Sequence, residues 1–355
     1  MLGGCCGTTP AHVRAICQAV AASSPVARPV TAASAGARAG GPVVIRAVQQ
    51  PEPAWPWEDE LVVAVGLQAP NGAQVAEFLE QATALRATGA GVLAILDAAP
   101  PAARISPVGA AVVVRERVGS EVLLPVEAAD RNLAALQADL LGAHALGIRM
   151  VVCRTGSPRV AGDYPLDPGG SPWDVDSVGL IAMLSALNEG IDWRGVATAE
   201  RTRFVIGGAV HTAAGELASE LDKVEAKLRA GAHFLVTDVI YDVEQATRAL
   251  GMLRARGVTL PVLATLAPFA DIRTLQRLSY EVPEASIPLS VLAGTARWQR
   301  RHQEDPEQII EFAIGAVEKL RHLISGVVVH VPGGVNEQAG QLVSALARLR
   351  RPGSR

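Results

Sequence analysis

Short apolar runs alternate with longer helical segments through most of the sequence, and this repeat constrains the fold more than any other feature. The runs are rich in Val, Ile and Leu, and the helical segments end near glycine. Eight such units in about 290 residues fit a closed barrel better than an open doubly wound sheet. We predict an α/β fold, a (β/α)8 TIM barrel over residues 60–355. The expected strands are residues 61–67, 91–96, 121–126, 149–154, 203–210, 233–238, 261–266 and 326–331.

The first 59 residues follow a different pattern and are predicted to lie outside the barrel. Residues 11–22 repeat apolar side chains at helical spacing, and a Thr-Thr-Pro start signal precedes them at residues 8–10. Residues 23–59 are rich in Ser, Ala, Gly and Pro, a composition that buries little apolar surface. We therefore expect a short helix, then a flexible linker, and then the barrel.

Charge and cysteine content favour a cytoplasmic protein with a small-molecule partner. The net charge is -3 and basic residues are scattered among acidic ones, which argues against nucleic acid or an anionic membrane as a partner. No apolar run reaches the roughly 18 residues that a membrane-spanning helix needs. The cysteines show no spacing typical of a disulfide framework, and they are Cys5, Cys6, Cys17 and Cys153.

One glycine-rich segment matches a nucleotide-binding fingerprint in letters but not in context. Residues 89–94 read Gly-x-Gly-x-x-Ala, yet they lie between a helical pattern and the strand that follows it. Pyrophosphate binding needs the reverse order, with a strand before the glycines and a helix after them. We interpret Gly89 as the end of a helix.

The N-terminal segment GGCCGTTPAHVRAI, residues 3–16, resembles the closing zinc motif of homocysteine S-methyltransferases. In that family two adjacent cysteines join a distant third cysteine to hold zinc. Here Cys5 and Cys6 have no third partner or methyltransferase barrel upstream, so the resemblance implies a remnant of a methyltransferase C-terminus over residues 1–22. We expect no metal site and no methyl transfer to homocysteine, although association with a separate methyltransferase chain or a homo-oligomer stays possible.

A larger resemblance covers about 290 residues. Residues 130–152, 173–195, 202–210 and 228–245 are similar to the reductase half of proteins that combine homocysteine S-methyltransferase with methylenetetrahydrofolate reductase. The resemblance implies a (β/α)8 barrel. It also implies a bound FAD, NAD(P)H as the reductant, and a folate substrate, 5,10-methylenetetrahydrofolate, that is reduced to 5-methyltetrahydrofolate.

The positions that carry this family's chemistry are changed in the sequence. Gly66 stands where the family has the glutamate acid, Ser157 where it has an aspartate beside the flavin, and Asp238 where it has a glutamine for the folate. Opening the folate ring to an iminium ion requires a proton donor, which glycine cannot be. The resemblance thus implies catalytic positions at Ser157 and Asp238, with Asp238 or Glu127 as a candidate substitute acid.

Other polar positions of the family persist, and two functions remain open. The resemblance implies that these residues bind the flavin nucleotide, although Asp, Asn and Thr also suit loops and helix caps. One hypothesis is an atypical but active reductase. The alternative is a catalytically degenerate barrel that binds folate, a flavin nucleotide or a partner chain without turnover. The candidate cofactor-binding residues are Asp130, Arg131, Asn132, Thr155, Gly156, Trp173, Asp174, Asp176 and Lys227.

Overall fold

A computed structural model divides the chain into two compact units, Met1–Gly41 and Pro42–Arg355. The first unit contains helix α1, Pro10–Ala21, within one residue of the helix expected from the sequence. The expected boundaries at residues 22 and 59 fall at or beyond the edges of the described segments, so the domain limits stay predictions. The described residues are 9–21, 61–70, 72–96, 104–129, 131–156, 174–268, 273, 275–276, 287, 292–293, 306–331 and 337–349.

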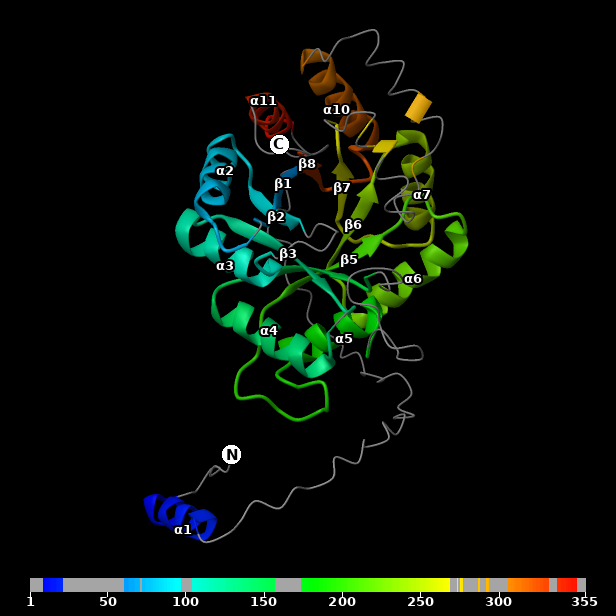
Figure 1. The fold of residues 1–355 in the computed structure, drawn as a ribbon. Coiled ribbons are helices and arrows are strands. Elements are labelled where there is room, and N and C mark those ends of the chain that lie inside the picture. The colour runs from blue at the N-terminus through cyan, green and yellow to red at the C-terminus, as the bar shows by residue number, and fades with distance from the viewer. Residues whose placement is uncertain are drawn as a thin grey trace. The chain divides into compact units, whose positions relative to one another are not determined.

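The second unit is a closed barrel of parallel strands in which each strand pairs with the next and the last pairs with the first (Figure 1). This confirms the predicted (β/α)8 fold, and the strands begin and end within two residues of their expected limits. The strands are β1 Val62–Gln68, β2 Val92–Leu96, β3 Glu121–Glu127, β4 Met150–Arg154, β5 Val205–Val210, β6 Phe234–Val239, β7 Val262–Leu266 and β8 Gly326–His330.

Helices surround the barrel, as Figure 1 shows, and local sequence signals set their ends. Ser106, Asn132, Asp176 and Asp242 each accept a backbone N–H at the start of the helix that follows. Gly89 adopts a left-handed φ of 98° just after α2, as expected for a helix-ending glycine. The helices are α2 Ala76–Ala87, α3 Pro107–Val118, α4 Leu133–Ala145, α5 Ser177–Asn188, α6 Leu217–Ala230, α7 Val243–Ala255, α10 Pro306–Leu320 and α11 Glu337–Leu346.

The strands are apolar on both faces because one face lines the barrel interior and the other packs under the helices. Phe234 fills the interior beside Gly207, where a Cβ atom would lie only 2.4 Å from the Phe234 ring. Alternate residues of each strand face the barrel interior, and the last of them on each strand lies at the mouth of the barrel. The inner cluster contains Val62, Ala64, Val92, Ala94, Leu123, Met150, Val152, Phe234, Val236, Leu263 and Val328.

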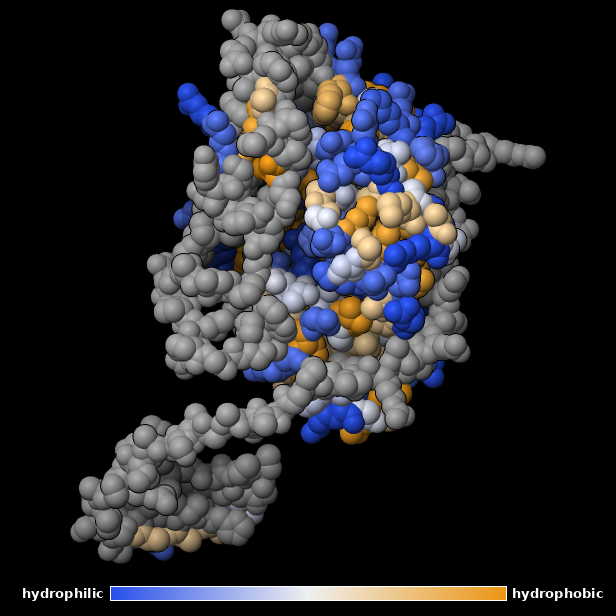
Figure 2. All heavy atoms as spheres, turned by 90° about the vertical axis from the view of Figure 1, so that its right-hand side faces the viewer, coloured by the Kyte–Doolittle hydropathy of each residue, from blue (hydrophilic) through white to orange (hydrophobic). Residues whose placement is uncertain are grey.

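The outside of the barrel is mixed in polarity. On the face shown in Figure 2, hydrophilic side chains lie between hydrophobic ones, as is usual for helices with one face on a core and the other in water. Among the described helices, none combines the length and apolar character needed to cross a membrane.

His233, which directly precedes β6, links stability to pH. Its Nδ1 accepts a hydrogen bond from the backbone N–H of Ile206 at 2.8 Å, so the ring must be neutral at that nitrogen. Burial lowers the pKa of His233 from 6.5 to about 4. Between these values the unfolded chain binds a proton that the folded chain does not. This contribution to stability is therefore complete above pH 6.5 and is lost as the pH falls towards 4.

We expect His233→Asn to flatten the dependence of unfolding free energy on pH between 6.5 and 4. The pKa difference corresponds to about 3 kcal/mol at full loss. An asparagine oxygen can accept the Ile206 N–H without titrating. Urea unfolding at several pH values measures the effect, with His322→Asn on an exposed histidine as the control. An unchanged slope in His233→Asn would show that other groups cause the acid sensitivity.

Candidate active site

On four strands, the last side chain that faces the barrel interior is polar. These residues are Glu127 on β3, Arg154 on β4, Asp238 on β6 and His330 on β8. The residues two positions earlier on β4, β6 and β8 belong to the apolar inner cluster, so the polar groups lie at the carboxyl ends of the strands. In a (β/α)8 barrel this end holds the ligand and the chemistry.

Glu127 and Arg154 are neighbours in the register of β3 and β4, and Glu127 Oε1 lies 4.0 Å from Arg154 Nη1. Both side chains are more than one-third exposed, so a ligand at the mouth can reach them. Gly156 holds the loop after β4 against this pair. Its φ is 81°, and a Cβ there would lie 2.6 Å from Ala129 Cβ and 3.3 Å from Glu127 Oε2. Only glycine fits this close contact.

Asp238 is held rigidly at the end of β6. Its Oδ1 accepts hydrogen bonds from the N–H of Thr212 at 2.9 Å and from the Thr212 hydroxyl at 2.8 Å. Its Oδ2 lies 3.9 Å from Nδ1 of His211, whose side chain is 53% exposed. Burial, with a contribution from Asp238, raises the pKa of Tyr241 to about 12, so that hydroxyl stays protonated. The arrangement is a carboxylate-imidazole pair that opens to solvent.

The space beside Gly66 is occupied by neighbouring side chains. Gly66 pairs with His330 in the register of β1 and β8. A Cβ on residue 66 would lie 2.8 Å from Leu96 Cδ1 and 3.1 Å from His330 Cδ2. Burial, and secondarily Arg154, lowers the pKa of His330 to about 4. The position at which the sequence resemblance predicts the family's acid is therefore bordered by an apolar group and a neutral imidazole.

Several expected cofactor residues join the loops after β3 and β4 to the helices that follow. Asn132 caps α4 through the N–H of Ala135, and Asp176 caps α5 through the N–H of Gly179. Asp174 Oδ2 accepts the N–H of Leu133, which fastens the start of α4. Thr155 Oγ1 accepts the N–H of Ser177, and Arg131 pairs with Asp139. These contacts coexist with a cofactor role, which stays a prediction.

Lys227 lies on the buried face of α6, against the outer face of β5. Its residue is 4% exposed, and Nζ donates a hydrogen bond to the carbonyl oxygen of Ala209. Its aliphatic chain covers Gly208, where a Cβ would lie 3.1 Å from Lys227 Cδ. Burial lowers the pKa of Lys227. The expected contact with a flavin phosphate remains untested, and its ammonium group already has a backbone partner.

Five of the residues named from the sequence lie outside the described residues. They are Cys5, Cys6, Asp130, Ser157 and Trp173. Within the described segments, no three His, Cys, Asp or Glu side chains are grouped as metal ligands.

The sequence reasoning missed Arg154, His211, Thr212 and His330. A simple signal was available, because Arg154 and His330 are the last residues of apolar strands and His211 directly follows one. Such positions carry function in this fold. Thr212 is evident only from its contact with Asp238, which joins the ends of two strands.

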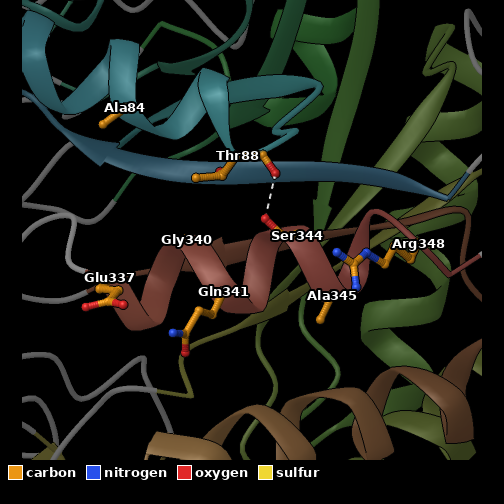
Figure 3. A pocket seen from close by; sticks show the side chains of 8 residues that line it. All are labelled: Ala84, Thr88, Glu337, Gly340, Gln341, Ser344, Ala345 and Arg348. Atoms are coloured by element: carbon orange, nitrogen blue, oxygen red, sulfur yellow. Dashed lines mark hydrogen bonds between the residues drawn. The ribbon is translucent and has the colours of Figure 1, made fainter.

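A separate groove of about 710 Å³ lies on the outer wall between α2 and α11 (Figure 3). Ser344 on α11 donates a hydrogen bond to the carbonyl oxygen of Thr88 at 3.0 Å. Gly340 permits the close approach, because a Cβ there would lie 3.1 Å from Thr88 Cγ2. The groove belongs to helix packing and not to the strand ends.

Comparison with known families supplies an independent assignment. The model of the family described as methylenetetrahydrofolate reductase matches residues 58–332, which is most of the chain. The chain belongs to the methylenetetrahydrofolate reductase family. A search of curated proteins gives no match. The family match covers the whole barrel from β1 to β8 and so includes every strand that contributes to the polar mouth.

Two solved structures resemble the chain to different degrees. An uncharacterized protein from Clostridium thermocellum, described as binding two copies of 5-methyl-5,6,7,8-tetrahydrofolic acid, is 15% identical with a TM-score of 0.54. The match covers 82% of this chain and 95% of that one. DmoA from Hyphomicrobium sulfonivorans is 12% identical with a TM-score of 0.46, covering 81% and 86% of the two chains. At these identities the first likeness shows a shared fold.

Proposed function

We propose that the protein is an atypical methylenetetrahydrofolate reductase that uses His211 and Asp238 for proton transfer. The observation that carries the proposal is the His211–Asp238 pair at the ends of β5 and β6, in a family member whose usual acid position is Gly66. The pair provides an acid-base group at the same end of the barrel. The folate named for the Clostridium thermocellum neighbour supports a folate ligand for this chain.

Glu127 and Arg154 are suited to hold the pterin ring of the folate. A pterin presents adjacent N–H donors on one edge, which a carboxylate accepts well, and ring oxygen and nitrogen acceptors elsewhere, which a guanidinium can contact. The two side chains face one another at 4.0 Å and remain partly exposed. A pterin between them and Asp238 would place its reactive part near the mouth's centre.

His211 is the better proton donor among the groups present. Histidine changes charge near neutral pH, which suits a general acid. Asp238 Oδ2 lies 3.9 Å from Nδ1 of the imidazole and orients the ring, while Thr212 fixes the carboxylate with two hydrogen bonds. His330 does not suit the role, because its pKa of about 4 keeps it neutral at pH 7. The proton from His211 assists opening of the five-membered ring to the iminium ion.

The family's flavin, when bound, supplies hydride from NAD(P)H to that iminium carbon. The described residues fit part of this cofactor. Asp174 and Asp176 are exposed and each uses one carboxylate oxygen for an internal hydrogen bond, which leaves the other oxygen for ribityl or ribose hydroxyl groups. Lys227 fits a phosphate less well, since its ammonium is buried and bonded to Ala209.

Two measurements on the purified protein test the proposal. Flavin absorbance after incubation with FAD and removal of excess reports cofactor binding, and formation of 5-methyltetrahydrofolate with NADH or NADPH reports turnover. We expect both. Folate binding without turnover, at any flavin or nicotinamide concentration, would contradict the proposal and favour the catalytically degenerate barrel.

A further inference from the structure

Arg104 lies in the loop after β2, at the ligand-binding end of the barrel. It pairs by a parallel bridge with Gly72, which is in the loop after β1. Two residues later Ser106 caps the twelve-residue helix α3. The bridge thus ties the loop that contains Arg104 to the loop after β1. Arg104 is also close in sequence to the start of a helix, where a partial positive charge favours anions.

The guanidinium of Arg104 has buried nitrogens without a partner. Nε and Nη1 are both buried, and neither has a hydrogen-bond acceptor among the residues that the structure describes. Buried charged groups are nearly always paired, because an unpaired one loses its hydration without compensation. Other cations of this end differ, since Arg131 pairs with Asp139 and Arg154 faces Glu127. Arg104 therefore carries two N–H donors that none of the described groups pairs.

We propose that Arg104 binds the anionic group of the ligand at the barrel mouth, a phosphate or a carboxylate. A guanidinium presents its N–H groups in a planar fork that matches either anion. The identity of the ligand that carries the anion, whether a flavin, a nicotinamide or a folate molecule, rests on the proposed function. The anion site itself is inferred from the unpaired donors and is independent of the proposed function.

The first experiment uses inorganic phosphate and thermal unfolding of the full chain. Phosphate should raise the unfolding temperature of the parent protein in a saturable manner, because a ligand bound only to the folded state stabilises it. Arg104→Met keeps an unbranched apolar stem and removes the guanidinium with its charge. We expect this variant to be no less stable without phosphate and to lose the phosphate response. Arg117→Met, at an exposed arginine of the same helix, is the matched control and should keep it.

The second experiment compares ligands that differ in charge, by equilibrium binding to the parent and to Arg104→Met. The pairs are FAD with riboflavin, NADPH with NADH, and 5-methyltetrahydrofolate with a tetrahydropterin that lacks the glutamate. The charged member whose dissociation constant rises roughly tenfold to a hundredfold in the variant identifies the source of the anion. The uncharged or less charged member should change little.

Two results would overturn the anion site. One is an Arg104→Met variant that is destabilised without phosphate yet keeps the phosphate response, which would indicate a structural role for the guanidinium. The other is a variant that binds every charged ligand as the parent does. Absence of reductase turnover in the parent protein, together with a phosphate response that Arg104→Met abolishes, would instead contradict the proposed function and leave the anion site standing.

Discussion

We expect His211→Gln and Asp238→Asn each to lower reductase kcat/KM by about a hundredfold to ten-thousandfold, the usual effect of removing general acid catalysis. Glutamine retains a polar group of similar length but cannot transfer the proton. Asparagine keeps the size of Asp238 and the hydrogen bond from the Thr212 N–H, but it removes the negative charge beside His211. Steady-state assays over a range of pH measure the effect.

The double variant provides a sharper test of the pair. If His211 donates the proton and Asp238 acts through it, the double variant should be about as slow as the His211 variant, because residues that act as a unit are not additive. Multiplying losses would instead indicate separate roles. His322→Gln, at an exposed histidine beyond α10, should retain parental kcat/KM. Parental activity in Asp238→Asn and His211→Gln would remove both from the mechanism.

The barrel was predictable because each of its signals is local. The strands are apolar on both faces, and four of the helices between them begin at Ser, Asn or Asp caps, so strand count and order follow from the chain itself. The limits of the strands were correct to within two residues. No such signal fixes residues 22–60, where composition alone supported a linker.

The candidate site was harder to predict because its contacts join distant segments. Asp238 could be named from the family resemblance, but its partner Thr212 lies 26 residues away along the chain, just after the neighbouring strand β5. The neighbours of Gly66 come from β2 and β8, so a sequence reader sees only a missing carboxylate. The structure adds that Leu96 and His330 border that space.

Arg104 and Lys227 show the same limit for charged groups. In the sequence both are simply basic residues. Lys227 is buried on the inner face of α6 and bonded to a carbonyl oxygen, whereas Arg104 has buried nitrogens without partners among the described residues. The difference depends on which backbone atoms the fold brings to each side chain, and sequence spacing does not contain that information.

We expect Phe234→Ala to lower the free energy of unfolding by about 3–5 kcal/mol, the usual effect of removing a fully buried phenylalanine. Phe234 is fully buried in the inner cluster at the start of β6. Its ring fills the space over Gly207 on β5, with ring atoms 2.4–2.9 Å from an ideal Cβ at that position. Without the ring, a cavity opens in the middle of the barrel. Urea unfolding, followed by two independent probes, measures the change.

Exchanging the large and small side chains at Phe234 and Gly207 tests whether the cavity causes the loss of stability. Gly207→Val alone should destabilise the protein by about 1–3 kcal/mol, since its methyl groups would collide with the Phe234 ring. Combined with Phe234→Ala, the same valine occupies the vacated space. The double variant should therefore be more stable than the sum of the two losses predicts. Phe312→Ala, at a phenylalanine that is 65% exposed on α10, should change stability little. Strict additivity of the two interior changes would mean that the ring does not fill the space above Gly207.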